Sequence, residues 1–338
     1  MDWFERITGF REGPYEETKS RLRVKDGQII NETSGVGHDV GRLELASLGD
    51  LRSLSAGVAL PGSLTLGILE GDVRKLHAAE ENEDATFQVA SQFNLLEMVG
   101  PGVSPEDGVT GYIHDRTQGP ACAIAAGAGT IWRNYLAPVG DRTGQTGSRQ
   151  LNGIADLEAA LARDMGTDVP LWEMRNGYAL PDRPRLEKIE THISGLDETG
   201  RDRLRALLRV GLHSDVGVTD PGAAPEARVS QVYASALPVA YSGIPAREWS
   251  GLASLILEAA YEATFHAALL NAARGRSNRL LLTRLGGGAF GNEEEWISKA
   301  ILRSLTLFRD YGIETLMVSY GPPDWAMREV ERAWSDAS

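Results

Sequence analysis

The last third of the chain alternates apolar runs with helical patterns, and this alternation most constrains the fold. The apolar runs have the length of buried strands, and the segments between them repeat apolar residues at helical spacing. The alternating segments are strands at 229–239, 280–285 and 315–318 and helices at 248–273, 292–311 and about 323–334. This alternation of strands and helices predicts an α/β fold, with a mixed or parallel sheet covered by helices on both faces.

One strand of this series runs into a helix through a loop rich in glycine. The strand 280–285 is followed by Gly286-Gly287-Gly288-Ala289-Phe290-Gly291, and Asn292 is the predicted N-cap of the helix, with three glutamates in its first turn. Such a loop offers unpaired backbone N–H groups to an anion, usually a phosphate. The alternative is a plain turn that needs left-handed glycines. The loop has neither the Gly-Lys-Ser/Thr of a Walker loop nor the glycine spacing of a Rossmann fingerprint.

Composition excludes several classes of protein. The 338 residues can form one large domain or two modest ones, and 34 basic against 47 acidic residues give a net charge of −13. That charge argues against a general nucleic-acid binder but is compatible with a nucleotide pocket held by backbone dipoles. Cys122 is the single cysteine and fits a reducing compartment. No apolar run is long enough to cross a membrane and no signal-peptide pattern opens the chain, so we expect a cytoplasmic protein, with delivery as an effector left open.

Two segments look like additions to the α/β core. Residues 1–60 contain a predicted hairpin around Lys25-Asp26-Gly27 and are expected to form an extension packed on the core. Residues 61–338 are expected to form the catalytic domain. Within it, 140–225 is a less regular α+β segment, which we interpret as an insertion that shapes one side of a pocket.

Four separated pieces of the sequence together resemble the macrodomain family. In order, they are Gly71-Asp72-Val73 after a strand, Asn94 after a second strand, a glycine-broken loop, and the glycine loop 286–291. The resemblance covers about 65–135 and 229–320. Macrodomains are three-layer α/β/α modules that bind ADP-ribose, so the resemblance implies that fold and that ligand. It implies no cofactor, and the scattered histidines show no metal spacing. The expected partners are ADP-ribose and an ADP-ribosylated protein, without nucleic acid or membrane; the oligomeric state stays open.

The resemblance assigns a role to each matching residue. Asp72 would accept a hydrogen bond from the adenine amino group, with Val73 close to the base, and Asn94 would lie near the distal ribose. The residues around the diphosphate would be Gly286, Gly287, Gly288, Ala289, Phe290, Gly291 and Asn292, with Phe290 packed against the ribose or the loop backbone. The structural alternatives are a helix cap for Asp72, a turn residue for Asn94 and a core residue for Phe290.

The loop after Asn94 departs from the common macrodomain pattern because it is acidic where a run of glycines is usual. It resembles the MavL-like branch, bacterial effectors that remove ADP-ribose from arginine side chains, through Asp107 and Asp115, eight residues apart. Glu106 is a further candidate. Carboxylates suit this chemistry, since they bind a guanidinium group and can orient water or stabilise an oxocarbenium-like centre. The alternative is that Ser104-Pro105-Glu106-Asp107 begins a helix and that Asp107 completes its cap.

The sequence therefore predicts an ADP-ribosyl hydrolase that acts on modified side chains, with arginine as the preferred linkage. Two alternatives remain open at this point. The chain could be a reader that binds ADP-ribose without cleaving it, or a hydrolase of poly(ADP-ribose) or nucleotide sugars.

Overall fold

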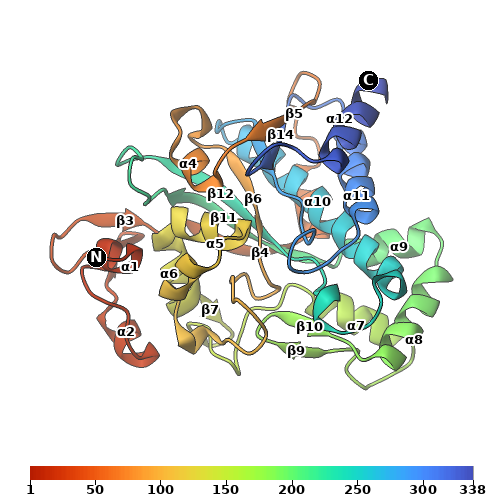
Figure 1. Ribbon diagram of the computed structural model, residues 1–338, viewed down its shortest axis with the longest axis horizontal. Coiled ribbons are helices and arrows are strands. Elements are labelled where there is room, and N and C mark those ends of the chain that lie inside the picture. The colour runs from red at the N-terminus through yellow and green to blue at the C-terminus, as the bar shows by residue number, and fades with distance from the viewer. Residues whose placement is uncertain (338) are drawn as a thin grey trace.

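A seven-stranded mixed sheet forms the centre of the computed structural model, which describes residues 1–337 (Figure 1). The strands, in their order across the sheet, are β4 (Arg42–Ser47), β11 (Arg209–Gly217), β12 (Arg228–Ala234), β6 (Thr86–Ala90), β13 (Arg279–Leu282), β14 (Glu314–Ser319) and β5 (Thr65–Glu70). Strand β11 is antiparallel to both of its neighbours, and every other adjacent pair is parallel. The parallel strands therefore end at one edge of the sheet.

Helices cover both faces of this sheet, because successive side chains of a strand point to opposite sides. Leu280 and Leu282 of β13 pack in the core that includes the helices α10 (Ser250–Ala273), α11 (Glu294–Leu307) and α12 (Trp325–Ala337). Leu281 packs on the other side, where the helices are α4 (Val73–Ala78), α5 (Gln118–Ala125) and α6 (Gly127–Tyr135). A strand that is buried on both sides has a continuous apolar run in its sequence. The predicted three-layer α/β/α fold with a mixed sheet is confirmed.

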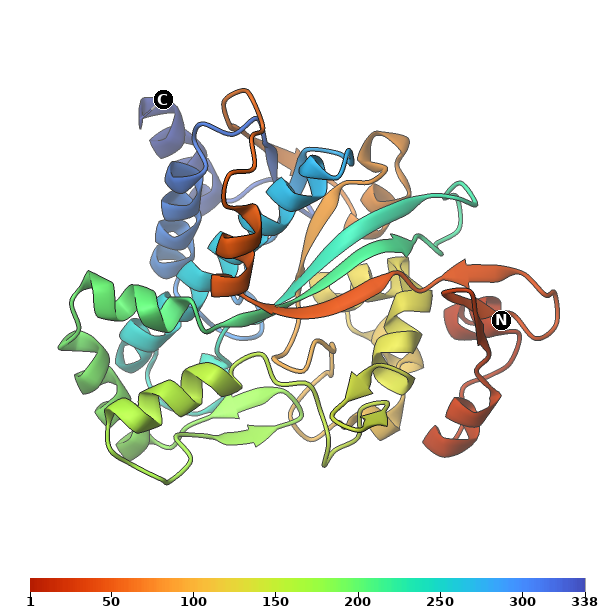
Figure 2. The same ribbon diagram turned by 180° about the vertical axis from the view of Figure 1, so that it is seen from behind.

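The N-terminal segment forms a small unit of its own beside α6 (Figure 1). It consists of α1 (Trp3–Thr8), α2 (Tyr15–Arg21), β1 (Val24–Lys25), β2 (Gln28–Ile30) and β3 (Gly37–Asp39). The predicted hairpin is present as β1 and β2, which pair antiparallel. Figure 2 shows β4 leaving this unit and lying beside β11, so the first 60 residues also supply an edge strand of the main sheet.

Residues 140–225 form most of the lobe below α10 in Figure 1. This segment begins at β8 (Arg142–Thr143), which pairs with β7 (Pro138–Val139). It continues through α7 (Ala155–Asp164), β9 (Glu173–Arg175), β10 (Tyr178–Leu180), α8 (Arg183–Ser194) and α9 (Glu198–Arg205). The predicted turn at Asn176-Gly177 joins β9 to β10, and both residues have positive φ, as a tight hairpin turn requires. The chain then returns to the main sheet as β11.

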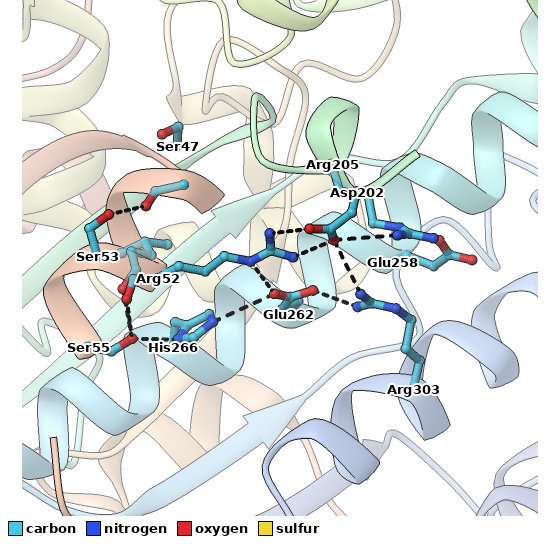
Figure 3. Close-up of polar contacts among 12 residues, drawn as sticks. Ser47, Arg52, Ser53, Ser55, Asp202, Arg205, Glu258, Glu262, His266 and Arg303 are labelled. Carbon is cyan, nitrogen blue, oxygen red and sulfur yellow. Dashed lines mark hydrogen bonds and ion pairs between the residues drawn. The ribbon is translucent and has the colours of Figure 1, made fainter. Parts of the chain in front are cut away.

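A partly buried group of charges joins four helices on the α10 face (Figure 3). Glu262 of α10 accepts hydrogen bonds from Arg52 of α3 (Leu48–Ser55) and from Arg303 of α11, each at 2.6 Å. Arg52 also donates to both carboxylate oxygens of Asp202, on α9, at 2.8 Å. The network therefore ties the lobe and the N-terminal third to the central helix. No helix within residues 1–337 is long and apolar enough to cross a membrane.

Candidate functional site

Two connected cavities open along the edge of the sheet where the parallel strands end. The larger has a volume of 660 Å³ and the smaller 170 Å³. They share the lining residues Asp115, Thr117, Gln118, Thr283 and Arg284, so they form one cleft. Ligands of open α/β sheets bind outside the carboxyl ends of the strands, and the cleft lies in that position.

The larger cavity is bordered by the start of α4 and by the residues after β14. Asp72 and Val73 line it, as does Tyr320, whose side chain is exposed. Asp72 is also the N-cap of α4, because its Oδ1 accepts a hydrogen bond from Arg74 N–H at 3.0 Å. The second carboxylate oxygen is not needed for this cap. Capping and binding are therefore compatible roles for Asp72.

The glycine loop borders the smaller cavity and carries unpaired donors. Gly286, Gly288, Ala289 and Phe290 line it, whereas Gly287 and Gly291 lie outside its lining. Within residues 1–337, the backbone N–H groups of Gly288, Ala289 and Phe290 donate to no acceptor. Successive free N–H groups in a turn are suited to bind an anion.

Two contacts hold this loop in place. The Tyr261 hydroxyl, on α10, donates to Thr283 O at 2.7 Å and accepts from Leu285 N–H at 2.9 Å. Gly286 has φ of +78°, and a Cβ there would lie 2.5 Å from Ala236 Cβ. Only glycine fits that position without a shift of the backbone.

The prediction that Asn292 caps the following helix was wrong. Helix α11 begins at Glu294, and Glu293 occupies the N-cap position without a side-chain hydrogen bond. Asn292 is buried, and its Nδ2 donates to Leu237 O at 2.8 Å. Its amide therefore fastens the loop to the segment after β12, and it lies outside the cavity lining.

Arg284 is the cation at the junction of the two cavities. It lines both of them, two residues before Gly286, and its guanidinium group contacts the carboxylates of Glu294 and Asp324. Its Nε is buried and has no hydrogen-bond partner in the described chain. An arginine at this place adds charge to the neutral donors of the loop.

The acidic loop does not bring its three candidate carboxylates to the cleft together. Asp115 lines both cavities, and its Oδ1 accepts a hydrogen bond from Thr117 N–H at 2.8 Å. Asp107 is exposed and accepts hydrogen bonds from Ser104 N–H at 2.7 Å and from the Ser104 hydroxyl, which completes a capping box. Glu106 is exposed and accepts from Gly147 N–H at 2.7 Å. Only Asp115 is among the lining residues, and the geometry favours the structural alternative for Asp107.

Asn94 does not reach the cleft. It is fully buried, its Nδ2 donates to Gln150 Oε1 at 2.9 Å, and its Oδ1 accepts from Leu96 N–H at 3.0 Å. These bonds stabilise the turn after β6, in which Leu95 has positive φ. The geometry therefore favours the turn alternative over contact with a ribose.

The structure adds residues that the sequence did not single out. Glu97, which stands in the apolar run after Asn94, lines the smaller cavity while its side chain is almost completely buried. Burial raises the pKa of Glu97 to about 8, although the nearby Arg133 opposes the shift. An isolated acid in an apolar run is a signal that could have identified it.

An aromatic wall, formed by Tyr178, Tyr241 and Phe290, closes the same cavity. The ring centroids are 5.3–5.8 Å apart, in tilted or edge-to-face arrangements. Tyr178 belongs to β10 and donates a hydrogen bond to Met98 O at 2.7 Å. The segment 140–225 thus supplies part of one side of the cleft. Among residues 1–337, no cluster of acidic, histidine or cysteine side chains could hold a metal ion.

Comparison with known proteins gives distant likenesses. No family model matches the sequence, and no curated protein matches it. A solved poly(ADP-ribose) glycohydrolase from Thermomonospora curvata is 14% identical, with 91% of this chain and 93% of that chain covered and a TM-score of 0.41. The glycohydrolase from Deinococcus radiodurans, in complex with ADP-ribose, is 12% identical, with 88% and 94% covered and a TM-score of 0.45. Both TM-scores are low, so these likenesses are distant.

Proposed function

We propose that this chain is an ADP-ribosyl hydrolase that releases ADP-ribose from modified protein side chains, with arginine as the preferred linkage. The observation that carries the proposal is the order of groups along the cleft. The larger cavity has a carboxylate and an exposed aromatic ring, the junction has Arg284 and Asp115, and the smaller cavity has the free N–H groups and the aromatic wall. A base in the larger cavity would place the diphosphate and the distal ribose of ADP-ribose at the junction and in the smaller cavity.

Each part of the cleft suits one part of the ligand. Asp72 can accept the adenine amino group, and Tyr320 offers a ring face on which the base can stack. The N–H groups of Gly288, Ala289 and Phe290, with Arg284, can bind the diphosphate. Asp115 would then lie at the distal ribose, where the carbon that bears the protein side chain is attacked.

The reaction needs a carboxylate at that carbon. Asp115 can take a proton from water as the water attacks, or can stabilise the positive charge that develops on the ribose ring. The arginine preference rests on the aromatic wall, because a guanidinium group binds both to a carboxylate and to aromatic faces. A polymer linkage between sugars presents no cation to this wall.

A panel of substrates tests the proposal. Protein targets that carry ADP-ribose on arginine, serine or glutamate are incubated with the chain, and released ADP-ribose is measured by mass spectrometry, beside calorimetry with free ADP-ribose. We expect tight binding and the fastest release from arginine. If the chain binds ADP-ribose but releases it from none of these linkages and does not cleave poly(ADP-ribose), the alternative of a non-catalytic reader would be supported. Absence of binding would contradict both functions.

Replacement of Arg284 tests the diphosphate position. Because Arg284→Ala removes the cation at the junction and leaves the backbone donors in place, we expect about 10-fold to 100-fold weaker binding of ADP-ribose. Calorimetry with adenosine serves as the comparison, since adenosine lacks the diphosphate and should lose little affinity. Equal losses for the two ligands would place Arg284 elsewhere than at the phosphates.

A further inference from the structure

Glu97 is a second carboxyl group on the cavity that contains Asp115. Only 1% of its side-chain surface is exposed, and that side chain lies beneath Gly119, where a Cβ would come within 3.2 Å of Glu97 Cγ. Glu97 and Asp115 both line the smaller cavity. One carboxyl is therefore shielded from water, while the other is partly exposed at the junction of the two cavities.

The cation nearest Glu97 also contacts neutral groups. Arg133 NH2 lies 3.4 Å from Glu97 Oε2 and 3.5 Å from Oε1, which is longer than the roughly 2.8 Å of a charge-assisted hydrogen bond. Arg133 Nε donates to Leu95 O at 2.8 Å, and its guanidinium group lies 3.7 Å from the centre of the Tyr233 ring. The contact between Glu97 and Arg133 therefore has the geometry of an ion pair, but it is longer than a charge-assisted hydrogen bond.

The other titratable groups that face Glu97 carry no opposite charge. They are Tyr112, whose hydroxyl accepts from Glu97 N–H at 3.2 Å, Cys122 on α5 and Tyr233 on β12. Burial raises the pKa of all three. Beyond Arg133, burial lowers the pKa of His213 to about 3, so that imidazole is neutral. Burial therefore dominates at Glu97, and with a pKa of about 8 this carboxyl group holds its proton at neutral pH.

We propose that Glu97 is the general acid of the reaction and that Asp115 is the general base. This assignment rests on the proposed function. The bond between the ribose carbon and the side-chain nitrogen breaks, and its electron pair goes to the nitrogen, which takes the proton of Glu97. The water oxygen bonds to the ribose carbon, and the proton of the water goes to Asp115. Transfer of that proton back to Glu97 through solvent restores both groups. Two carboxyl groups in environments that differ this much are the usual basis for dividing acid and base roles.

Glu97→Gln tests the assignment, because glutamine has nearly the same shape but cannot donate that proton. We expect release from arginine-linked protein to fall about 100-fold or more, with unchanged affinity for ADP-ribose. A 4-nitrophenyl ether of ADP-ribose has a leaving group that needs no proton, and the variant should cleave it nearly as fast as the wild type. Loss on both substrates, or on neither, would overturn the proposal.

The pH profile and a matched variant separate catalysis from structure. In the wild type, kcat/KM should fall above a pH of about 8, and this fall should disappear in Glu97→Gln. Glu158→Gln is the control, because burial also raises the pKa of Glu158, which accepts from Leu171 N–H outside the cleft. It should keep the wild-type rate and profile. If kcat/KM of Glu97→Gln still falls above a pH of about 8, the result would contradict the proposal.

Stability gives a readout that does not depend on activity. The folded chain keeps the proton of Glu97 between its usual pKa of 4.5 and about 8, whereas the unfolded chain releases it. The stability that this proton contributes is therefore complete below pH 4.5 and is lost as the pH rises to about 8, and Glu97→Gln should remove that loss. If stability instead rises with pH over this range, or if Glu97→Gln does not fold at neutral pH, Glu97 is charged and forms a structural ion pair with Arg133. If the wild type releases no ADP-ribose, the proposed function fails, but this trend still reports the proton of Glu97.

Discussion

Asp115→Asn is expected to lower the release of ADP-ribose from arginine-linked protein by about 1,000-fold. The amide keeps the shape of the side chain and can still accept the hydrogen bond from Thr117 N–H, so the loop should keep its conformation. It cannot take a proton from water or stabilise positive charge on the ribose. Affinity for ADP-ribose should change little, because the adenine and diphosphate contacts lie elsewhere in the cleft. Single-turnover release and calorimetry measure the two quantities separately.

Two variants make this result specific. Asp310→Asn changes an exposed carboxylate after α11 and should release ADP-ribose at the wild-type rate. Asp107→Asn decides between the two roles of Asp107, because asparagine can still accept from Ser104 N–H but cannot act as a base. A capping role predicts little change in release. If Asp107→Asn is inactive while Asp115→Asn is active, the assignment of Asp115 is wrong.

Glu262→Gln is expected to lower the free energy of unfolding by about 3 kcal/mol, the largest loss of stability that we predict. Only 4% of the Glu262 side chain is exposed, and its carboxylate accepts hydrogen bonds from Arg52 and Arg303 (Figure 3). Removal of the charge leaves these two guanidinium groups with Asp202 as their remaining shared partner. Urea denaturation followed by circular dichroism measures the loss. Binding of ADP-ribose to the folded variant should be unchanged, since the network lies outside the cleft lining.

The pH dependence of stability provides a second measurement on Glu262. Burial alone would raise its pKa, but the nearby His266 and the hydrogen bonds from Arg52 and Arg303 outweigh burial and hold the pKa well below its usual 4.5. Because the folded-state pKa is lowered, the stability that it contributes is present above pH 4.5 and is lost as the pH falls below that value. The difference in the free energy of unfolding between the wild type and Glu262→Gln should therefore become smaller in acid.

The exposed pair Glu295–Lys299 is the matched control for Glu262. Both side chains are 71% exposed and lie one turn apart on α11. Glu295→Gln should leave the free energy of unfolding close to the wild-type value, because exposed pairs contribute little. Equal losses of unfolding free energy in the two variants would show that burial of the Glu262 network does not add to stability.

The layered core was predictable because strand and helix leave different periods in the sequence. Leu280, Leu281 and Leu282 form an apolar run, and a strand covered by helices on both faces needs that pattern. The glycine loop was also predictable, since glycine is required where φ is positive and a neighbour lies close, as at Gly286. These features depend on local sequence and on short-range sterics.

The functional partners could be predicted only in part, because they depend on long-range contacts. Nothing local to Asn292 shows that its amide bonds to Leu237, 55 residues earlier, so the cap was assigned to the wrong residue. Two aspartates eight residues apart gave no information on which of them faces a cavity, because Asp107 ends one short helical turn and a second turn, Thr110–His114, separates it from Asp115. Tyr178 reaches the cleft from a different lobe. Packing of distant segments decides each of these positions.

Hydrogen exchange with and without ADP-ribose shows directly whether the cleft binds this ligand. Amide protection reports which segments a ligand orders or covers. If the cleft binds ADP-ribose, new protection should appear at residues 72–74, at 115–120 and above all at 288–290, whose N–H groups are free in the unliganded chain. Protection confined to other parts of the chain, or none at saturating ADP-ribose, would contradict the account.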